Sequence, residues 1–180
     1  TYLALSNSSI LSNTANSSGG GVYVSDKAVL QTCDNVYSNN TARGNSDSDG
    51  GGGALYINDV GVVISTNDRY GYNQATQGYG GAIYARTAAN ISSTNSFYIS
   101  NVATNGSGGA IYVSSRAAFS STSDNIKNNK VAASGGWGGC LYVDQEGRVH
   151  MDSTTFQYHS VSKYGGSIYV SSGANVSILN

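Results

Sequence analysis

The sequence predicts an all-β protein, a right-handed, single-stranded parallel β-helix of about six coils with three short strands in each coil. Three observations predict this fold. A six-residue block recurs six times, a second block alternates with it, and the 180 residues include 24 Gly, no Pro and only 11% charged residues. Because the repeats run along nearly the whole chain, residues 1–180 are expected to form one domain. Right-handed winding is the default for parallel crossovers.

The first block reads Gly-Gly, a small residue, an aliphatic residue, Tyr, and then Val, Ile or Ala. Its tyrosines are 33, 28, 28, 30 and 27 residues apart, and they are Tyr23, Tyr56, Tyr84, Tyr112, Tyr142 and Tyr169. Side chains alternate between the two faces of a strand. We therefore expect the residues flanking each tyrosine to point into the coil. The tyrosines should form an exterior ladder, with the small residue two positions earlier on the same side. The opposite assignment, with the tyrosines inside, remains open.

The second block reads hydrophobic-x-x-Asn, usually followed by Ala. Its asparagines are Asn13, Asn39, Asn73, Asn101 and Asn129, and His159 replaces the Asn in the last copy. We expect these asparagines to form a ladder at a corner of the coil, where their amides bridge one coil to the next.

A third, weaker apolar block follows each repeat tyrosine by five to eight residues, as in Ala28/Leu30 and Ala89/Ile91. Three strands in about 28 residues match one coil, and equivalent strands of successive coils pair about 4.8 Å apart. Residues that tolerate a positive φ, namely Gly, Asn and Asp, suit the corners. Pro cannot donate to the strand ladder, which explains its absence.

The alternating motifs resemble the repeats of the chlamydial polymorphic outer-membrane proteins, which are surface passengers of autotransporters, and of related extracellular repeat proteins. The resemblance covers residues 10–170. The Gly-Gly half is matched six times, whereas only Phe156 supplies the Phe of the Phe-x-x-Asn half, and His159 stands there in place of Asn. The resemblance implies an extracellular or cell-surface location, structural display or adhesion, and no catalysis.

The composition argues against several classes of partner. The formal net charge of −1 does not suit a nucleic-acid-binding protein, which needs a surplus of Lys and Arg. No apolar run approaches the roughly 20 residues that span a bilayer, so membrane insertion is not expected. We expect no cofactor. We also expect no metal site, because Asp47-Ser48-Asp49-Gly50 lacks the later ligands of a calcium loop. Cys33 and Cys140 lie about four coils apart, too far for a disulfide, and should be free thiols.

Parallel β-helices also carry polysaccharide lyases and hydrolases, which need clustered or paired carboxylates. The best candidate is the outward-facing set Arg148, His150 and Asp152 on one strand. Neighbouring coils offer Ala118, Ser120, Asn175 and Ser177 at those positions, so no second carboxylate joins the set. We therefore expect a solvated face and no catalytic residues.

Glycans are the other candidate chemistry. N-glycosylation motifs occur at Asn7, Asn16, Asn90, Asn105 and Asn175, and a sixth occurs at Asn39. In a eukaryotic source we expect glycans at several of these sites, but not at Asn39, which the ladder should cover. Trp137 lies in an extended corner and could stack on a sugar, with Tyr79 and Tyr164 in the equivalent segments; plain corner packing is the alternative.

Thr1–Leu5 and Ala174–Asn180 fall in the same strand register, and neither carries the Lys or Pro that protects an exposed edge. We therefore expect copies of the chain to stack end to end. The first hypothesis is a non-catalytic extracellular structural protein, a subunit of a head-to-tail fibril or a segment of a surface stalk, with N-linked glycans. The alternative is an adhesin that binds cell-surface carbohydrate, and the third hypothesis is a polysaccharide lyase or hydrolase.

Overall fold

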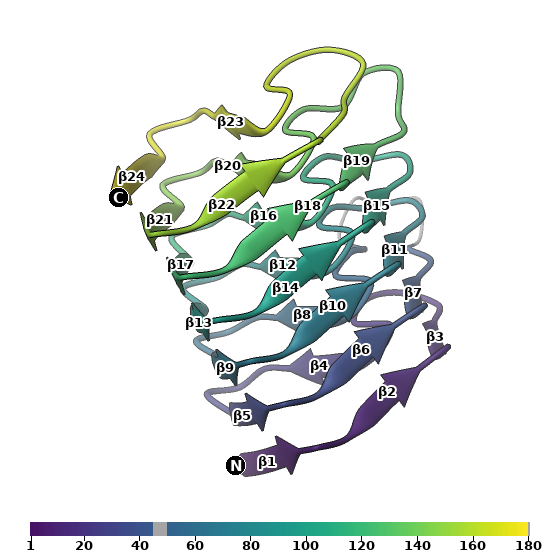
Figure 1. Cartoon of the computed structure of the whole chain (residues 1–180), viewed down its shortest axis with the longest axis vertical. Helices are drawn as coiled ribbons and strands as arrows, with labels where there is room; N and C mark the ends of the chain where they lie inside the picture. Colours follow the sequence, from purple (N-terminus) through teal and green to yellow (C-terminus); the bar gives the residue numbers. More distant parts are fainter. Residues whose placement is uncertain (45–49, 180) are drawn as a thin grey trace.

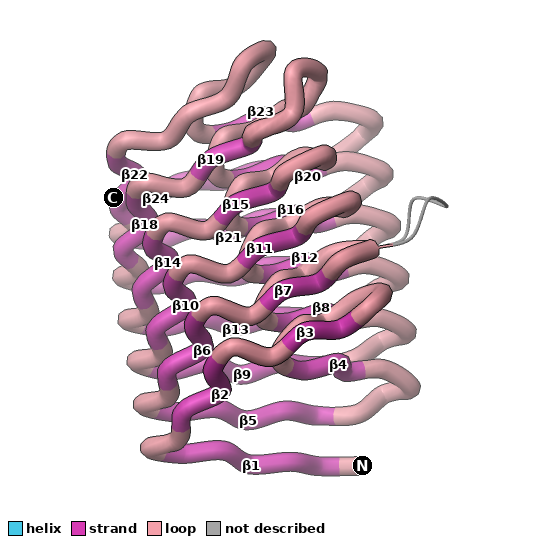
Figure 2. The backbone as a smooth tube through the Cα atoms, turned by 90° about the vertical axis from the view of Figure 1, so that its right-hand side faces the viewer, coloured by secondary structure: helices cyan, strands magenta, loops and turns pink. Residues whose placement is uncertain are grey.

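A computed structural model describes residues 1–44 and 50–179 as a parallel β-solenoid of about six turns. In Figure 1 the front strands run from left to right and the rear strands from right to left while the chain rises from its N terminus, so the coil is right-handed. Figure 2 shows the coils stacked one on another with loops at the corners. The predicted fold class is confirmed.

The longest strands, five residues each, form a seven-stranded parallel sheet that we call sheet A. Its strands, in order, are β1 (Tyr2–Ser6), β5 (Val29–Cys33), β9 (Val62–Thr66), β13 (Asn90–Thr94), β17 (Ala118–Thr122), β21 (Arg148–Asp152) and β24 (Asn175–Leu179). Pairing is residue for residue, so that Leu30 lies beside Val63. The first and last described strands share this sheet, as their common register predicted.

Sheets B and D each have six three-residue strands. Sheet B contains β2 (Ser9–Leu11), β6 (Val36–Ser38), β10 (Arg69–Gly71), β14 (Phe97–Ile99), β18 (Asn125–Lys127) and β22 (Thr155–Gln157). Sheet D contains β4 (Val22–Val24), β8 (Leu55–Ile57), β12 (Ile83–Ala85), β16 (Ile111–Val113), β20 (Leu141–Val143) and β23 (Ile168–Val170). Sheet D carries the repeat tyrosines at the middle position of every strand.

The prediction of three strands per coil is wrong, because a fourth sheet lies between sheets B and D. Sheet C consists of two-residue strands, namely β3 (Thr14–Ala15), β7 (Thr41–Ala42), β11 (Gln74–Ala75), β15 (Val102–Ala103) and β19 (Lys130–Val131). Two residues are too few to show alternation in a sequence. Ala42, Ala75, Ala103 and Val131 in these strands are buried, and in the sequence they were visible only as the residue after the Asn block.

The core is a single apolar column along the axis of the coil. The residues flanking the repeat tyrosines lie in this column or pack against it as predicted, except for Val170, which is 42% exposed in the last coil. Both Ile83 and Ala85 are fully buried there. The small residue two positions before the tyrosine also lies in this core, as Ala82 and Cys140 show. That residue was expected on the tyrosine's side. The chain turns at this corner, so simple alternation does not extend across it.

Three more tyrosines stack inside the core, where sheet B faces sheet A. The rings of Tyr37 and Tyr70, and those of Tyr70 and Tyr98, have centroids 4.9 Å apart in each pair. Their hydroxyls form hydrogen bonds with the inward-facing hydroxyls of sheet A, which belong to Thr32, Ser65 and Ser93. Each buried phenol hydroxyl therefore has a hydrogen-bond partner inside the otherwise apolar core. Burial raises the pKa of Tyr37 to about 12.

Two glycine columns explain the Gly-Gly of the repeat. The first glycine of each copy, for example Gly80, has a positive φ of 64°. The second approaches the next coil so closely that a Cβ at Gly81 would clash with the carbonyl oxygen of Gly109. Neither position accepts an ordinary L residue without strain.

Cys33 and Cys140 are both free, as predicted. Cys140 is fully buried in the core, and burial raises its thiol pKa. Cys33 lies on the outer side of sheet A, where its Sγ donates to Asp34 Oδ2 at 3.2 Å.

Candidate functional site

The repeat tyrosines form one continuous aromatic ladder on the outer side of sheet D. Consecutive ring centroids along Tyr23, Tyr56, Tyr84, Tyr112, Tyr142 and Tyr169 are 5.0, 5.2, 4.8, 4.9 and 5.4 Å apart. The four central tyrosines make a cluster separate from the main core. The outward assignment is therefore right and the inside assignment is wrong.

The exterior ladder is nevertheless not open to solvent along most of its length. Tyr84 and Tyr142 are only 4% and 6% exposed, whereas the first member, Tyr23, is 53% exposed. The corner that joins sheet C to sheet D folds over the central rings. The sequence could not show this cover, because it is made by loops that begin in a different strand block.

Aromatic side chains from this corner form the cover, which we call the aromatic lid: Tyr79, Trp137 and Tyr164. The ring of Tyr79 lies 4.6 Å from that of Tyr112. Trp137 stacks on Tyr169 with centroids 5.9 Å apart and an interplanar angle of 18°. Lys163 Nζ sits 5.4 Å from the centroid of the Trp137 ring and 5.5 Å from that of Tyr164, a cation–π geometry. Trp137 therefore packs within the corner, which was the alternative to stacking on a sugar.

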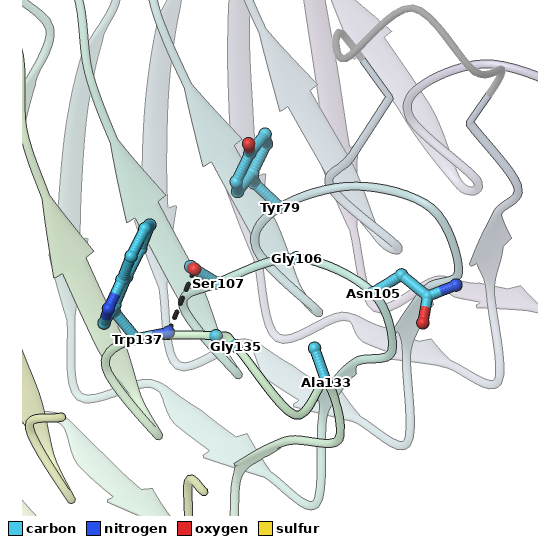
Figure 3. Close-up of a pocket in the computed structure, with 8 residues that line it drawn as sticks. Tyr79, Asn105, Gly106, Ser107, Ala133, Gly135 and Trp137 are labelled. Atoms are coloured by element: carbon cyan, nitrogen blue, oxygen red, sulfur yellow. Dashed lines mark hydrogen bonds between the residues drawn. The ribbon is translucent and has the colours of Figure 1, made fainter. Parts of the chain in front are cut away.

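A pocket of 270 Å³ opens beside the aromatic lid, between Tyr79 and Trp137. Figure 3 shows the rings of Tyr79 and Trp137 with Ser107 between them, whereas the carboxamide of Asn105 lies farther out and points away from the two rings. The backbone N–H of Trp137 donates to Ser107 Oγ at 3.0 Å, which ties the two coils together at the base of the pocket. Gly106, Ala133, Gly135 and Gly136 complete the lining, so every lining residue is uncharged.

A buried carboxyl group anchors the ladder at its edge. The hydroxyl of Tyr112 donates to Asp144 Oδ1 at 2.9 Å. Burial raises the pKa of Asp144 above its usual range. Burial, reinforced by the nearby Asp144 carboxylate, also raises the pKa of Tyr112. The phenol therefore stays a neutral donor at physiological pH.

The asparagine ladder exists, with one correction. Its members are Asn13, Asn40, Asn73, Asn101 and Asn129, and each Oδ1 after the first accepts from the backbone N–H of the previous member at 2.8–3.0 Å. Asn39, predicted as the second member, is instead an exposed corner residue with φ 56°. The hydrophobic residue in register is Tyr37, not Val36, so the Asn three residues later is Asn40.

His159 occupies the ladder position after Asn129. The backbone N–H of Asn129 donates to His159 Nδ1 at 3.2 Å. Burial lowers the pKa of the imidazole, which keeps this nitrogen available as an acceptor near neutral pH.

A second polar ladder, at the corner between sheets A and B, was missed by sequence reasoning. Here the backbone N–H of Asn35 donates to Asp68 Oδ1 at 2.8 Å, and that of Ser96 donates to Asp124 Oδ1 at 2.7 Å. Ser65 Oγ also donates to Asp68 Oδ2 at 2.7 Å. Both carboxyl groups are buried, and burial raises their pKa values. The mixed Ser, Asn, Asp and Thr identities at this position hid it as a repeat.

The glycosylation candidates all lie at the surface. Asn7, Asn16, Asn90, Asn105 and Asn175 are exposed. Asn39 is exposed as well, so the reason for excluding it, burial in the asparagine ladder, does not hold. Asn105 borders the pocket described above, and its side-chain nitrogen donates to Gln77 Oε1 at 3.0 Å.

The residues considered for catalysis lie as expected on the outer face of β21. Arg148 and His150 are exposed, and they pair with Ala118 and Ser120 on one side and with Asn175 and Ser177 on the other. The described residues contain no group of three or more His, Cys, Asp or Glu side chains that could hold a metal ion. The calcium-loop fragment at Asp47–Asp49 lies outside the described residues.

None of the described segments is a helix long and apolar enough to cross a membrane. Comparison of the chain with protein-family models, with curated proteins and with solved structures found no match.

Proposed function

We propose that this chain is a non-catalytic structural protein of the cell surface or extracellular space, where it forms a rigid rod. The carrying observation is the asparagine ladder, which links successive coils from Asn13 to Asn129 through hydrogen bonds that are buried from Asn40 onward. The tyrosine ladder runs parallel to it on the outer side of sheet D. Every coil is thus tied to the next by backbone, amide and aromatic contacts.

The same coil-to-coil chemistry makes one coil a complementary surface for another. We therefore extend the proposal to end-to-end stacking of copies, in which an edge strand of one copy adds to an edge strand of the next. Such a contact does not close on itself and builds a fibril. If copies do not stack end to end, the rod is instead a segment of a surface stalk. The resemblance to chlamydial surface repeats supports the extracellular placement, and the exposed glycosylation motifs are compatible with N-linked glycans there.

Electron microscopy of the purified chain tests the two forms. Stacked copies should appear as filaments with an axial repeat near 29 Å, which is about six coils at ~4.8 Å each. Particles that remain monodisperse at high concentration would reject the fibril. The rod itself is tested by single-molecule stretching, where we expect a high, stepwise unfolding force that falls when Asn101 is replaced by Ala. An unchanged force would reject the load-carrying role of the ladder.

A carbohydrate-binding adhesin is the second candidate. The observation that favours it is the uncharged pocket between Tyr79 and Trp137 beside the aromatic lid.

A further inference from the structure

One corner position of the solenoid carries large side chains in some coils and small ones in others. Gly51, Tyr79, Ser107, Trp137 and Tyr164 each stand immediately before a Gly-Gly pair. Backbone pairing of Gly51 with Tyr79 and of Trp137 with Tyr164 places them in one column. The bonds from Gly80 N–H to Ser107 O and from Gly108 N–H to Trp137 O place Ser107 between the two aromatic residues.

Ser107 therefore interrupts the aromatic lid for one coil. Tyr79 covers Tyr84 and Tyr112, and Trp137 covers Tyr142 and Tyr169. Where a ring would stand between Tyr79 and Trp137, the structure has the buried hydroxyl of Ser107 and the pocket. We call this gap the ring slot.

The width of the ring slot suits one inserted ring. Two coil spacings separate the backbones of Tyr79 and Trp137 by about 9.6 Å. Atoms in van der Waals contact lie about 3.5–4.0 Å apart, so a ring held between two others needs roughly 7–8 Å. The remaining width accommodates the axial hydrogens of a puckered ring. The volume of 270 Å³ is below that of a site for a drug-sized ligand, so it holds a single ring.

The lining indicates the chemistry of that ring. The aromatic rings of Tyr79 and Trp137 suit an apolar C–H face, whereas the Ser107 hydroxyl between them and the Asn105 carboxamide at the rim are polar groups that can form hydrogen bonds. Because no charged residue lines the slot, it offers no counter-charge to an ionised ligand. A ring with apolar faces and a hydroxylated rim is a neutral pyranose.

We propose that the ring slot between Tyr79 and Trp137 binds one neutral pyranose ring. The proposal develops the adhesin candidate and is independent of the structural role, which rests on the ladders. Two sources can supply this ring: carbohydrate on another molecule, or an N-linked glycan attached to Asn105 on the rim of the slot.

The first experiment uses the chain produced in bacteria, which carries no N-linked glycan. Trp137 is its only tryptophan, so tryptophan fluorescence reports on the slot alone. The protein is titrated with N-acetylglucosamine, glucose, galactose and mannose. We expect a saturable fluorescence change with at least one of them. No saturable change with any of the four would overturn the proposal.

Matched variants decide whether the response comes from the slot. Tyr79→Ala keeps the reporter but removes one wall, and we expect about tenfold weaker binding. Tyr72→Ala removes a solvent-exposed tyrosine seven residues earlier and should leave binding unchanged. Ser107→Tyr adds the ring type found elsewhere in the column and should abolish binding. Equal binding by Tyr79→Ala and wild type would overturn the proposal even if Ser107→Tyr failed to fold.

The second experiment assigns the source, using the chain secreted by a eukaryotic host and shown by glycopeptide mass to carry a glycan on Asn105. If that glycan fills the slot, free sugar no longer changes the fluorescence, and Asn105→Gln restores the response. If the response persists with Asn105 glycosylated, the ligand is carbohydrate on another molecule. Ser107→Tyr is not used here, because it also destroys the glycosylation motif.

Discussion

Asn101 Oδ1 accepts two hydrogen bonds from Asn73, one from its backbone N–H at 3.0 Å and one from its side-chain nitrogen at 3.1 Å. Asn101 Nδ2 in turn donates to the carbonyl oxygen of Tyr70 at 2.9 Å. A single buried amide thus satisfies three polar groups of the preceding coil, and the pattern repeats along the ladder.

We expect Asn101→Ala to lower the free energy of unfolding by about 2–4 kcal/mol, because it leaves buried donors on Asn73 and the carbonyl of Tyr70 without partners. Denaturant unfolding followed by circular dichroism measures the change. Asn90→Ala, at an exposed strand position, is the matched control and should change stability by less than about 0.5 kcal/mol. An equal change in the free energy of unfolding for the two variants would show that the buried Asn101 amide stabilises the fold no more than an exposed side chain does.

Asp68 lies buried in the second polar ladder, and burial raises the pKa of its carboxyl group. A carboxyl whose pKa is raised by folding stabilises the fold below its unfolded pKa, and this contribution is lost as pH rises through the folded value. Asn35 occupies the equivalent position one coil earlier and donates to Thr32 Oγ1 at 2.7 Å. Asp68→Asn can make the same bond to Ser65, so we expect it to stabilise the protein near pH 7.

The pH dependence identifies the cause. Thermal melts of Asp68→Asn and wild type should differ most near neutral pH and converge as pH falls toward the ordinary carboxyl pKa. Asp34→Asn, at an exposed corner one residue before Asn35, should match wild type throughout. A destabilised Asp68→Asn at pH 7 would mean that the charged form is the better ladder member.

Val60 adopts a left-handed conformation, with φ 61°, although it is β-branched and half exposed. Its N–H donates to Thr87 O at 3.0 Å in the next coil, which holds the corner in place. The left-handed conformation costs an L residue about 1–2 kcal/mol, and Asn pays less of it. We expect Val60→Asn to stabilise the protein by about 1 kcal/mol in denaturant unfolding. Val62→Asn, at a strand position, should not stabilise it.

Gly81 tests the close approach of coils. A Cβ there would clash with the carbonyl oxygen of Gly109, whereas a Cβ at Gly135 would meet no atom within 4 Å. Gly81→Ala should therefore destabilise the chain by several kcal/mol or prevent folding, since the clash is with backbone. Gly135→Ala should be nearly neutral. The comparison is made by thermal melting; a tolerated Gly81→Ala would mean that neighbouring coils can separate.

The two-block repeat predicted the solenoid, its number of coils and the inward aliphatic residues, because each of these follows from periodicity along the chain. The register of the tyrosine ladder followed in the same way, since a six-residue block repeated at a similar spacing brings equivalent residues together in successive coils.

Other features depended on how the corners fold in three dimensions. Sheet C is too short to show a pattern, and the choice between Asn39 and Asn40 turned on which of two adjacent hydrophobic residues points inward. The aromatic lid and the ring slot arise where Tyr79, Ser107 and Trp137 meet across coils. Periodicity determines what stacks along the axis of this protein, whereas the exposure of each ladder depends on loops that cross it. Those loops are placed by backbone turns and close contacts that local sequence does not encode.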